Sequence, residues 1–180
     1  MSKPPLSTSN LNRAAARLGC TLERLEDVCG IKAGLTGFDV AGRPLVRLEG
    51  DVFSELSGAF FDDSHPSVSH LPPADRHYAR GKTLDERNDG EHARLALASS
   101  LSSADALKAT RWGRFMLLGK DHTLCGHRGI SSFVNAMHRD EASQLDCFVA
   151  FVLAQPPLLG SLRTGNVRKF FHLTQTNLKA

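Results

Sequence analysis

A short stretch two-thirds of the way along the chain holds side chains that can bind a metal ion. His122, Cys125 and His127 could supply three zinc ligands from one turn. A structural zinc site needs a fourth ligand, and no residue stands at a known spacing from these three to provide it. The spacing therefore does not support a metal site, and we expect neither a metal nor another cofactor.

Two further patterns resemble sites but lack what the chemistry needs. The Gly-Lys-Thr sequence at 81–83 looks like the end of a phosphate-binding loop, yet Arg76 stands where such a loop has its first glycine. Three histidines are scattered over one polar segment, where imidazoles are usually solvated: His65, His70 and His77. Neither pattern predicts a site.

The composition is that of an ordinary globular domain. The chain has 180 residues, of which 41% are hydrophobic and 23% charged, and its net charge of +3 is only mildly basic. No apolar run has the length of a membrane span, and the aromatic residues do not alternate with a basic stripe, so we expect no membrane span and no nucleic-acid partner. The cysteines have no Cys-x-x-Cys spacing and are expected to be reduced and mostly buried: Cys20, Cys29, Cys125 and Cys147.

The spacing of apolar residues predicts a mainly helical α+β domain. About eight short segments show helical spacing, and residues 141–154 form the expected central helix. One segment alternates as a strand does, which predicts a small β-hairpin near residues 38–48. The segment 112–119 is expected to form a compact apolar turn. The residues expected to be buried are Trp112, Phe115, Leu145 and Phe148.

The ends and one long connection are expected to be irregular. Residues 1–9 are polar, contain two prolines and are expected to be flexible, ahead of a single domain at 10–180 in which the first helix is capped by Asn10. Residues 57–82 keep no sustained period and predict a long surface loop.

Three stretches carry glycine and aromatic motifs in a definite order. Residues 27–53 contain Gly37-Phe38, Gly42-Arg43-Pro44, Glu49 and Phe53. Residues 106–127 contain Trp112, Gly113, Phe115, Gly119, Cys125 and Gly126. Residues 132–152 contain a Gln-Leu pair followed by an aromatic and aliphatic run. Together they resemble the N-acetylmuramidase family of phage endolysins, a lysozyme-like group that cleaves the glycan strand of peptidoglycan.

The resemblance implies a lysozyme-like cleft and also shows where this chain departs from the family. The family's catalytic acid is a glutamate after the second helix, and Lys32 stands in its place, expected at the mouth or floor of the groove. Glu49 is the retained carboxylate near the cleft, in a supporting position. The family's glutamine and histidine at the cleft are replaced here by Met116 and Asp51. The groove is expected to be formed by Arg47, Asp51, Trp112, Arg114, Met116 and His172.

The absence of the family's glutamate bears on whether the protein can catalyse glycoside cleavage. Lysine is a far weaker acid than a carboxylic acid, and its charge opposes an oxocarbenium-like transition state. We therefore expect a pseudoenzyme retained as a binding module, either for the peptidoglycan glycan strand or for a protein partner such as a related hydrolase or a secretion component. The alternative is a divergent peptidoglycan glycosidase, an endolysin or antibacterial effector, that uses Glu49 as its acid. A third reading is an unrelated helical binding protein.

The expected location follows from the first residues of the chain. They include no apolar segment of the kind found in secretory signals, so we expect synthesis in the cytoplasm without a signal peptide. Release to the periplasm, or export by machinery other than the Sec pathway, would then bring the protein to the cell wall.

Overall fold

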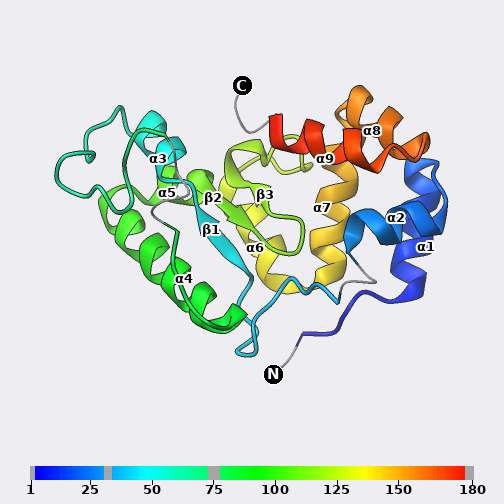
Figure 1. The fold of residues 1–180 in the computed structure, drawn as a ribbon, viewed down its shortest axis with the longest axis horizontal. Coiled ribbons are helices and arrows are strands. Elements are labelled where there is room, and N and C mark those ends of the chain that lie inside the picture. Colours follow the sequence, from blue (N-terminus) through cyan, green and yellow to red (C-terminus); the bar gives the residue numbers. More distant parts are fainter. Residues whose placement is uncertain (1–2, 31–33, 73–77, 177–180) are drawn as a thin grey trace.

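Helices make up most of the structure (Figure 1). The structure is a computed structural model, and it describes residues 3–30, 34–72 and 78–176. The helices and strands in this part of the chain are α1 (Thr8–Leu18), α2 (Leu22–Cys29), β1 (Val46–Leu48), α3 (Gly50–Leu56), α4 (Leu84–Leu101), α5 (Ser103–Ala109), β2 (Thr110–Trp112), β3 (Leu117–Leu118), the 3-10 helix η2 (Gly119–Asp121), α6 (Ile130–Arg139), α7 (Glu141–Leu153), α8 (Pro156–Arg163) and α9 (Val167–Thr176). The prediction of a mainly helical α+β domain is confirmed.

The elements form two groups, one on each side of the small sheet (Figure 1). The helices α1, α6 and α8 pack directly on α7, and α9 packs on α8. On the other side, α4 packs on β1 and α5, and α3 packs on α5. The small sheet therefore lies between a group of helices that begins and ends the chain and a group drawn from its middle.

The helix α7 is the central helix that the sequence predicts. Asp140 caps it, because its side chain accepts a hydrogen bond from the Ser143 amide at 2.7 Å. Its buried side chains include Leu145, Phe148 and Val149. Burial of a large apolar side chain contributes about 1.5–3 kcal/mol, so this helix supplies much of the hydrophobic stabilisation.

None of the described helices is by itself long and apolar enough to cross a bilayer. Only α7 and α8 taken together have that length and composition, and a bend of 106° separates them.

The strands do not pair as the sequence predicts. Residues 38–48 do not form a two-stranded hairpin, because Phe38 and Pro44 make only an isolated bridge. The segment between them is a turn in which the Asp39 carboxylate accepts from the Arg43 amide at 2.8 Å. The strand β1 instead pairs with β2, and β2 pairs with β3, in one antiparallel sheet of order β1-β2-β3. Alternation along a strand identifies the strand but not its partner, which here lies more than sixty residues further on.

The predicted apolar turn at 112–119 contains the hairpin that joins β2 to β3. The chain turns between Gly113 and Met116, whose amide donates to the Gly113 carbonyl at 3.2 Å. Both residues have positive φ, +69° at Gly113 and +47° at Met116. Because a side chain disfavours this conformation by roughly 1–2 kcal/mol, Met116 must be held there by its surroundings.

The start of the chain is more ordered than predicted. The helix α1 is capped by Ser7 rather than by Asn10 and begins at Thr8. The Asn10 side chain accepts from the Ser7 amide at 3.0 Å. The Leu6 amide donates to the Glu141 carboxylate at 3.1 Å. Part of the segment 1–9 is thus fixed against α7. The described part of the predicted loop 57–82 consists of turns and bends, as expected.

We predict that Gly113→Ala destabilises the protein by about 2–4 kcal/mol. A Cβ at this residue would lie 2.6 Å from Gln144 Cδ, and the positive φ adds its own penalty. Gly160→Ala is the control, because Gly160 lies in α8 and nothing beyond the adjoining part of its own helix lies within 4 Å of the added Cβ. This variant should be stabilised by about 0.5–1 kcal/mol. Urea unfolding of both variants measures the two effects, and equal midpoints would contradict the prediction.

Candidate functional site

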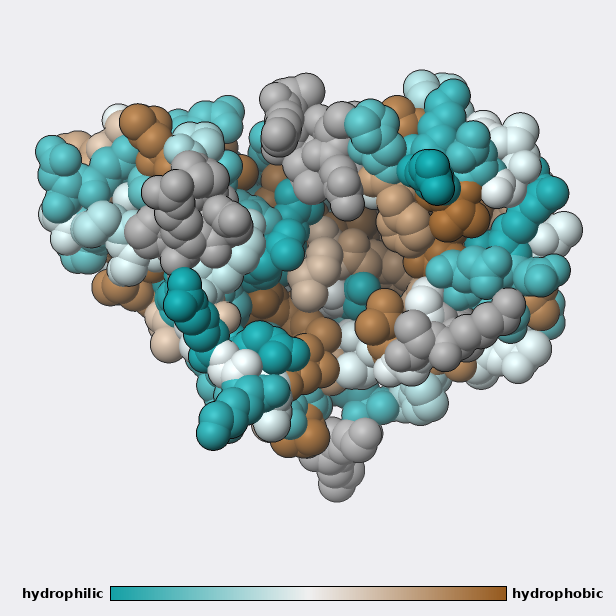
Figure 2. Space-filling model, viewed as in Figure 1, coloured by the Kyte–Doolittle hydropathy of each residue, from teal (hydrophilic) through white to brown (hydrophobic). Residues whose placement is uncertain are grey.

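A cleft is formed by two cavities that share the side chains of Arg47 and Met116. Figure 2 shows a hollow in the middle of one face of the molecule, with brown and tan residues at its floor. The first cavity has a volume of about 160 Å³ and is lined by Arg47, Arg111, Phe115, Met116, Leu117, Leu118, Asp121, Phe148, Phe151 and Thr174. The second has about 250 Å³ and is lined by Leu45, Val46, Arg47, Tyr78, Ala79, Leu84, Arg87, Asn88, Glu91 and Met116.

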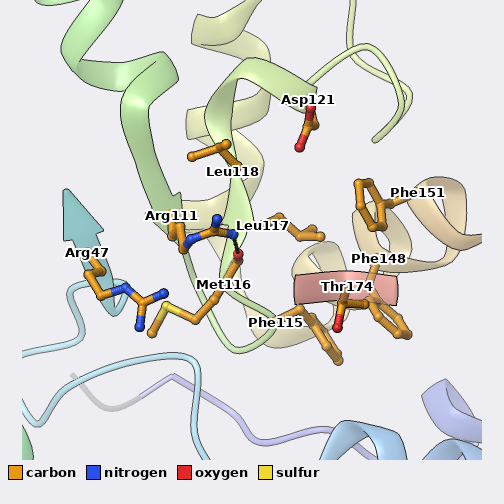
Figure 3. A pocket seen from close by; sticks show the side chains of 10 residues that line it. All are labelled: Arg47, Arg111, Phe115, Met116, Leu117, Leu118, Asp121, Phe148, Phe151 and Thr174. Atoms are coloured by element: carbon orange, nitrogen blue, oxygen red, sulfur yellow. Dashed lines mark hydrogen bonds between the residues drawn. The ribbon is translucent and has the colours of Figure 1, made fainter. Parts of the chain in front are cut away.

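The register of the sheet places two arginines side by side in the first cavity. Arg47 of β1 lies opposite Arg111 of β2. The neighbours of Arg47 along the strand, Val46 and Leu48, are buried in the core. Since side chains alternate between the faces of a strand, the apolar pair fixes which face Arg47 must take. Figure 3 shows both guanidinium groups at one side of the cavity, across from the phenylalanines of the opposite wall.

The opposite wall is aromatic. The rings of Phe115 and Phe148 are stacked with their centroids 4.4 Å apart and an interplanar angle of 15°. Phe148 is buried as predicted, but Phe115 is only half-buried, so one predicted core residue belongs to the cleft wall instead. The cleft thus combines an aromatic wall with charged groups, which is typical of ligand pockets.

Glu49 forms ion pairs with both arginines from the end of β1. Its Oε1 accepts hydrogen bonds from Arg111 Nε at 2.5 Å and from Arg47 Nε at 3.1 Å, and its Oε2 accepts one from the Tyr78 hydroxyl. The Arg47 guanidinium also lies over the Tyr78 ring, 4.8 Å from its centroid. The Glu49 side chain is 7% exposed and that of Arg111 is 9% exposed. This cluster is therefore a buried ion pair, with Arg47 at its open edge.

The carboxyl groups at the cleft have opposite protonation tendencies. Burial raises the pKa of Glu49, but Arg47, Tyr78 and Arg111 together outweigh burial, and the net pKa is below the ordinary value. Burial raises the pKa of Asp121 above its ordinary value, against the weaker effect of Lys120 and Arg111. Glu49 therefore stays ionised at lower pH than an exposed glutamate, whereas Asp121 keeps its proton more readily than an exposed aspartate.

Only some of the predicted groove residues line the cleft. Arg47 and Met116 line both cavities of the cleft. Trp112 does not, because it is 2% exposed in the core and donates from Nε1 to the Leu107 carbonyl at 3.1 Å. Arg114 is paired with Glu141 at 3.0 Å, and both side chains are 4% exposed.

The other predicted positions lie away from the cleft or outside the description. Asp51 is in the first turn of α3 and His172 is on the exposed side of α9, and neither is among the residues that line the two cavities. Lys32 lies outside the described residues, so its place relative to Glu49 stays a prediction.

Sequence reasoning missed the residues that complete the cleft. Arg111 precedes Trp112 in a strand of three residues that are all buried, so no alternation assigns its side chain to a face. Tyr78 comes from the long connection before α4, where no periodicity indicates what a side chain contacts.

Asp121 directly precedes the stretch of His122, Cys125 and His127, whose residue types could bind a metal ion. In the structure His122 Nδ1 bonds the Gly119 carbonyl oxygen at 3.1 Å, and among the described residues no three His, Cys, Asp or Glu side chains converge as a metal site requires.

Comparisons with known proteins agree with this architecture. A family model described as N-acetylmuramidase matches residues 21–173. Among solved structures, the chain is similar to the Burkholderia AP3 phage endolysin, with a TM-score of 0.79 and 33% sequence identity over 93% of this chain. The match spans 62% of that endolysin's chain, so this chain corresponds to part of it. No curated protein matches.

The helices, the small sheet and the cleft between them define a peptidoglycan-hydrolase fold of the lysozyme-like class. Because the family model covers most of the sequence, the chain belongs to the N-acetylmuramidase family. The resemblance that the glycine and aromatic motifs indicated is confirmed.

We predict that Glu49→Gln destabilises the protein by about 3–5 kcal/mol at neutral pH, because it leaves the buried Arg111 charge without its counter-ion. The folded pKa of Glu49 is lowered, so its contribution is complete above the unfolded value of about 4.3 and is lost as the pH falls through the folded pKa. The difference between wild type and variant should therefore shrink in acid.

Asp51→Asn is the matched control for this measurement. It removes a carboxylate two residues away that only favours the start of α3, which is worth about 0.3–1 kcal/mol. Thermal unfolding between neutral and acidic pH compares the three proteins, and a pH-independent loss in Glu49→Gln would contradict the assigned ion pair.

Proposed function

We propose that this protein is a muramidase-fold pseudoenzyme that binds peptidoglycan through its cleft without cleaving it. The observation that carries the proposal is the state of Glu49, held ionised between Arg47 and Arg111 by hydrogen bonds at 3.1 and 2.5 Å. The presence of Lys32 at the position of the family's catalytic glutamate supports it from the sequence. To act on the cell wall, such a protein would be released from the cytoplasm by a route other than the Sec pathway.

Glycoside cleavage needs a carboxylic acid that gives a proton to the leaving oxygen. At neutral pH that acid must have a raised pKa, in the range of about 6. Glu49 has the opposite tendency, and its oxygens are already occupied by two guanidinium groups and a hydroxyl. It therefore fits the structural role and does not fit the alternative in which it acts as the acid.

Binding of a glycan requires contacts with the cleft but no proton donor. The stacked Phe115 and Phe148 offer an aromatic face for the apolar side of a sugar ring, and Arg47 offers donors at the edge of the same cavity. These are contacts that hold a ligand, and none of them requires a proton transfer. A protein partner in the same cleft is the competing occupant, which the binding experiments below distinguish from glycan.

One observation favours a second candidate, a glycosidase that uses Asp121. This carboxyl lies in the first cavity and burial raises its pKa, which is the condition for a general acid. Among the described residues that line the cleft, the other carboxylate is Glu91. It is paired with Arg94 at 2.9 Å and accepts from the Leu48 amide at 2.8 Å, so it has a structural role. An active enzyme would therefore depend on Asp121 rather than on Glu49.

We predict that the purified protein does not reduce the turbidity of cell-wall suspensions, and that Lys32→Glu alone does not give a normal rate. General acid catalysis supplies only about 10²–10⁴-fold, and Met116 has replaced another polar cleft residue. An active endolysin is the positive control. Lysis by the wild type that Asp121→Asn abolishes would overturn the proposal in favour of the second candidate.

We also predict that Phe115→Ala weakens retention on insoluble peptidoglycan by about tenfold. The reason is the loss of Phe115, the half-buried and more accessible ring of the aromatic pair. A stacking contact of this kind is worth about 0.5–1.5 kcal/mol beyond the buried area. Phe60→Ala is the matched control, since Phe60 is 81% exposed and does not line the cleft. Co-sedimentation with purified cell walls gives both affinities. Failure of the wild type to bind would leave a protein partner as the occupant and contradict the glycan-binding proposal.

A further inference from the structure

A third cavity, of about 160 Å³, lies away from the cleft beside the connection between η2 and α6. Its lining includes two thiols, Cys125 and Cys147, and the ring of His127. Both cysteines are 3% exposed, whereas Arg139 and Asp146, which also line the cavity, are exposed. The cavity therefore connects two buried thiols with the surface.

The hydrogen bonds around His127 fix which ring nitrogen faces the thiol. The Ser132 hydroxyl donates to the Gly129 carbonyl at 2.8 Å, so its oxygen is free to accept from His127 Nδ1 at 3.3 Å. In that tautomer Nδ1 carries the proton and Nε2 carries the lone pair. Nε2 lies 3.2 Å from Cys147 Sγ, so the basic nitrogen is directed at the thiol. The edge-on packing of the ring against Phe133, at 5.9 Å, holds the same orientation.

The charges around this pair favour a neutral base beside a protonated thiol. Burial, with help from His122 and Arg139, lowers the pKa of His127, so the imidazole is neutral at pH 7. Burial raises the pKa of Cys147 to about 12, Asp146 adds to the effect and Arg139 opposes it. The sulfur then becomes a nucleophile only when a base takes its proton during the attack, and His127 is placed to be that base.

We propose that Cys147 is a thiol-modification site for low-molecular-weight disulfides of the glutathione type. The Cys147 sulfur attacks one sulfur of the disulfide, the S–S bond breaks, and one glutathione thiolate leaves. The thiol proton moves to His127 Nε2 and then to the departing thiolate. The product is a mixed disulfide at Cys147, with one molecule of glutathione released in its reduced form.

Cys125 is placed to complete the exchange. It lines the same cavity as Cys147 and is as deeply buried, at 3% exposed. Attack of the Cys125 thiol on the Cys147 sulfur would break the bond to glutathione and form a Cys125–Cys147 disulfide. The second glutathione would leave as a thiol, carrying the proton that Cys125 loses. Each of these two sulfurs is oxidised by one electron, and the two sulfurs of oxidised glutathione are reduced. Arg139 adds a cation at the surface side of the cavity, which suits the carboxylates of glutathione.

The test is incubation of the reduced protein with oxidised glutathione, followed by intact-mass and peptide mass spectrometry. We expect Cys147 to be the first cysteine modified, and Cys125→Ser to accumulate the mixed disulfide that the wild type converts to an internal disulfide. Cys20, half-buried beside Arg24 and Arg163, is the internal reference thiol. If Cys147 reacts no faster than Cys20, the proposal is wrong.

The role of His127 is tested separately through the rate and its pH dependence. His127→Gln should slow the reaction of Cys147 at pH 7 by at least tenfold. The wild-type rate should stay flat above pH 7, where the imidazole is already neutral, whereas the rate of Cys20 should rise by about tenfold per pH unit with its thiolate fraction.

A second variant tests the role of His127 without changing the histidine itself, in case His127→Gln impairs folding. Ser132→Ala removes the partner of Nδ1 from an exposed position of α6 and should give a smaller slowing with an unchanged melting temperature. Unchanged Cys147 kinetics in both the His127 and Ser132 variants would overturn the assignment of His127 as the base.

Discussion

The buried ion pair between Glu141 and Arg114 holds together the parts of the chain that make the cleft. Glu141 Oε2 accepts from Arg114 Nη1 at 3.0 Å, and Oε1 accepts from the Gly37 amide at 2.6 Å. The Leu6 amide is bound to the same carboxylate. One side chain at the start of α7 therefore fixes the segment before α1, the loop after α2 and the turn that carries Phe115 and Met116. Loss of one member of such a pair costs about 3–5 kcal/mol, because the other charge stays buried.

Gln144, one helical turn further along α7, explains why glycines stand at two of the motif positions. Its Oε1 accepts from the Arg114 amide at 2.8 Å, and its Nε2 donates to the Met137 carbonyl at 2.9 Å. An added Cβ at Gly37 would lie 2.1 Å from Gln144 Oε1, and one at Gly113 would also clash with this side chain. The glycine motifs of the sequence thus mark the places where two loops close on a buried amide.

Local patterns predicted what depends on near neighbours in the chain. Helical spacing located α7 and its buried residues, because the apolar positions repeat within a few turns. The order of three short motifs along the chain identified the family. The pairing of β1 with β2 could not be predicted, since three-residue strands contain too little alternation to specify a distant partner. The same limit applies to the site. Met116 was named because it stands at the position of the family's glutamine, whereas Tyr78 reaches Glu49 from a connection without a periodic pattern.

The sheet register also determines what the retained carboxylate can do. Pairing Val46 with Trp112 sends both apolar side chains into the core, and it necessarily places Arg47 beside Arg111 on the opposite face. Two adjacent guanidinium groups, one of them buried, need a negative charge between them, and Glu49 provides it. Protonation of Glu49 would leave both cations without that charge, so folding favours the ionised form. A general acid must instead hold its proton until the glycosidic bond breaks. Folding therefore requires Glu49 to be ionised, whereas acid catalysis would require it to be protonated. The hydrogen bonds at Glu49 satisfy the requirement of folding.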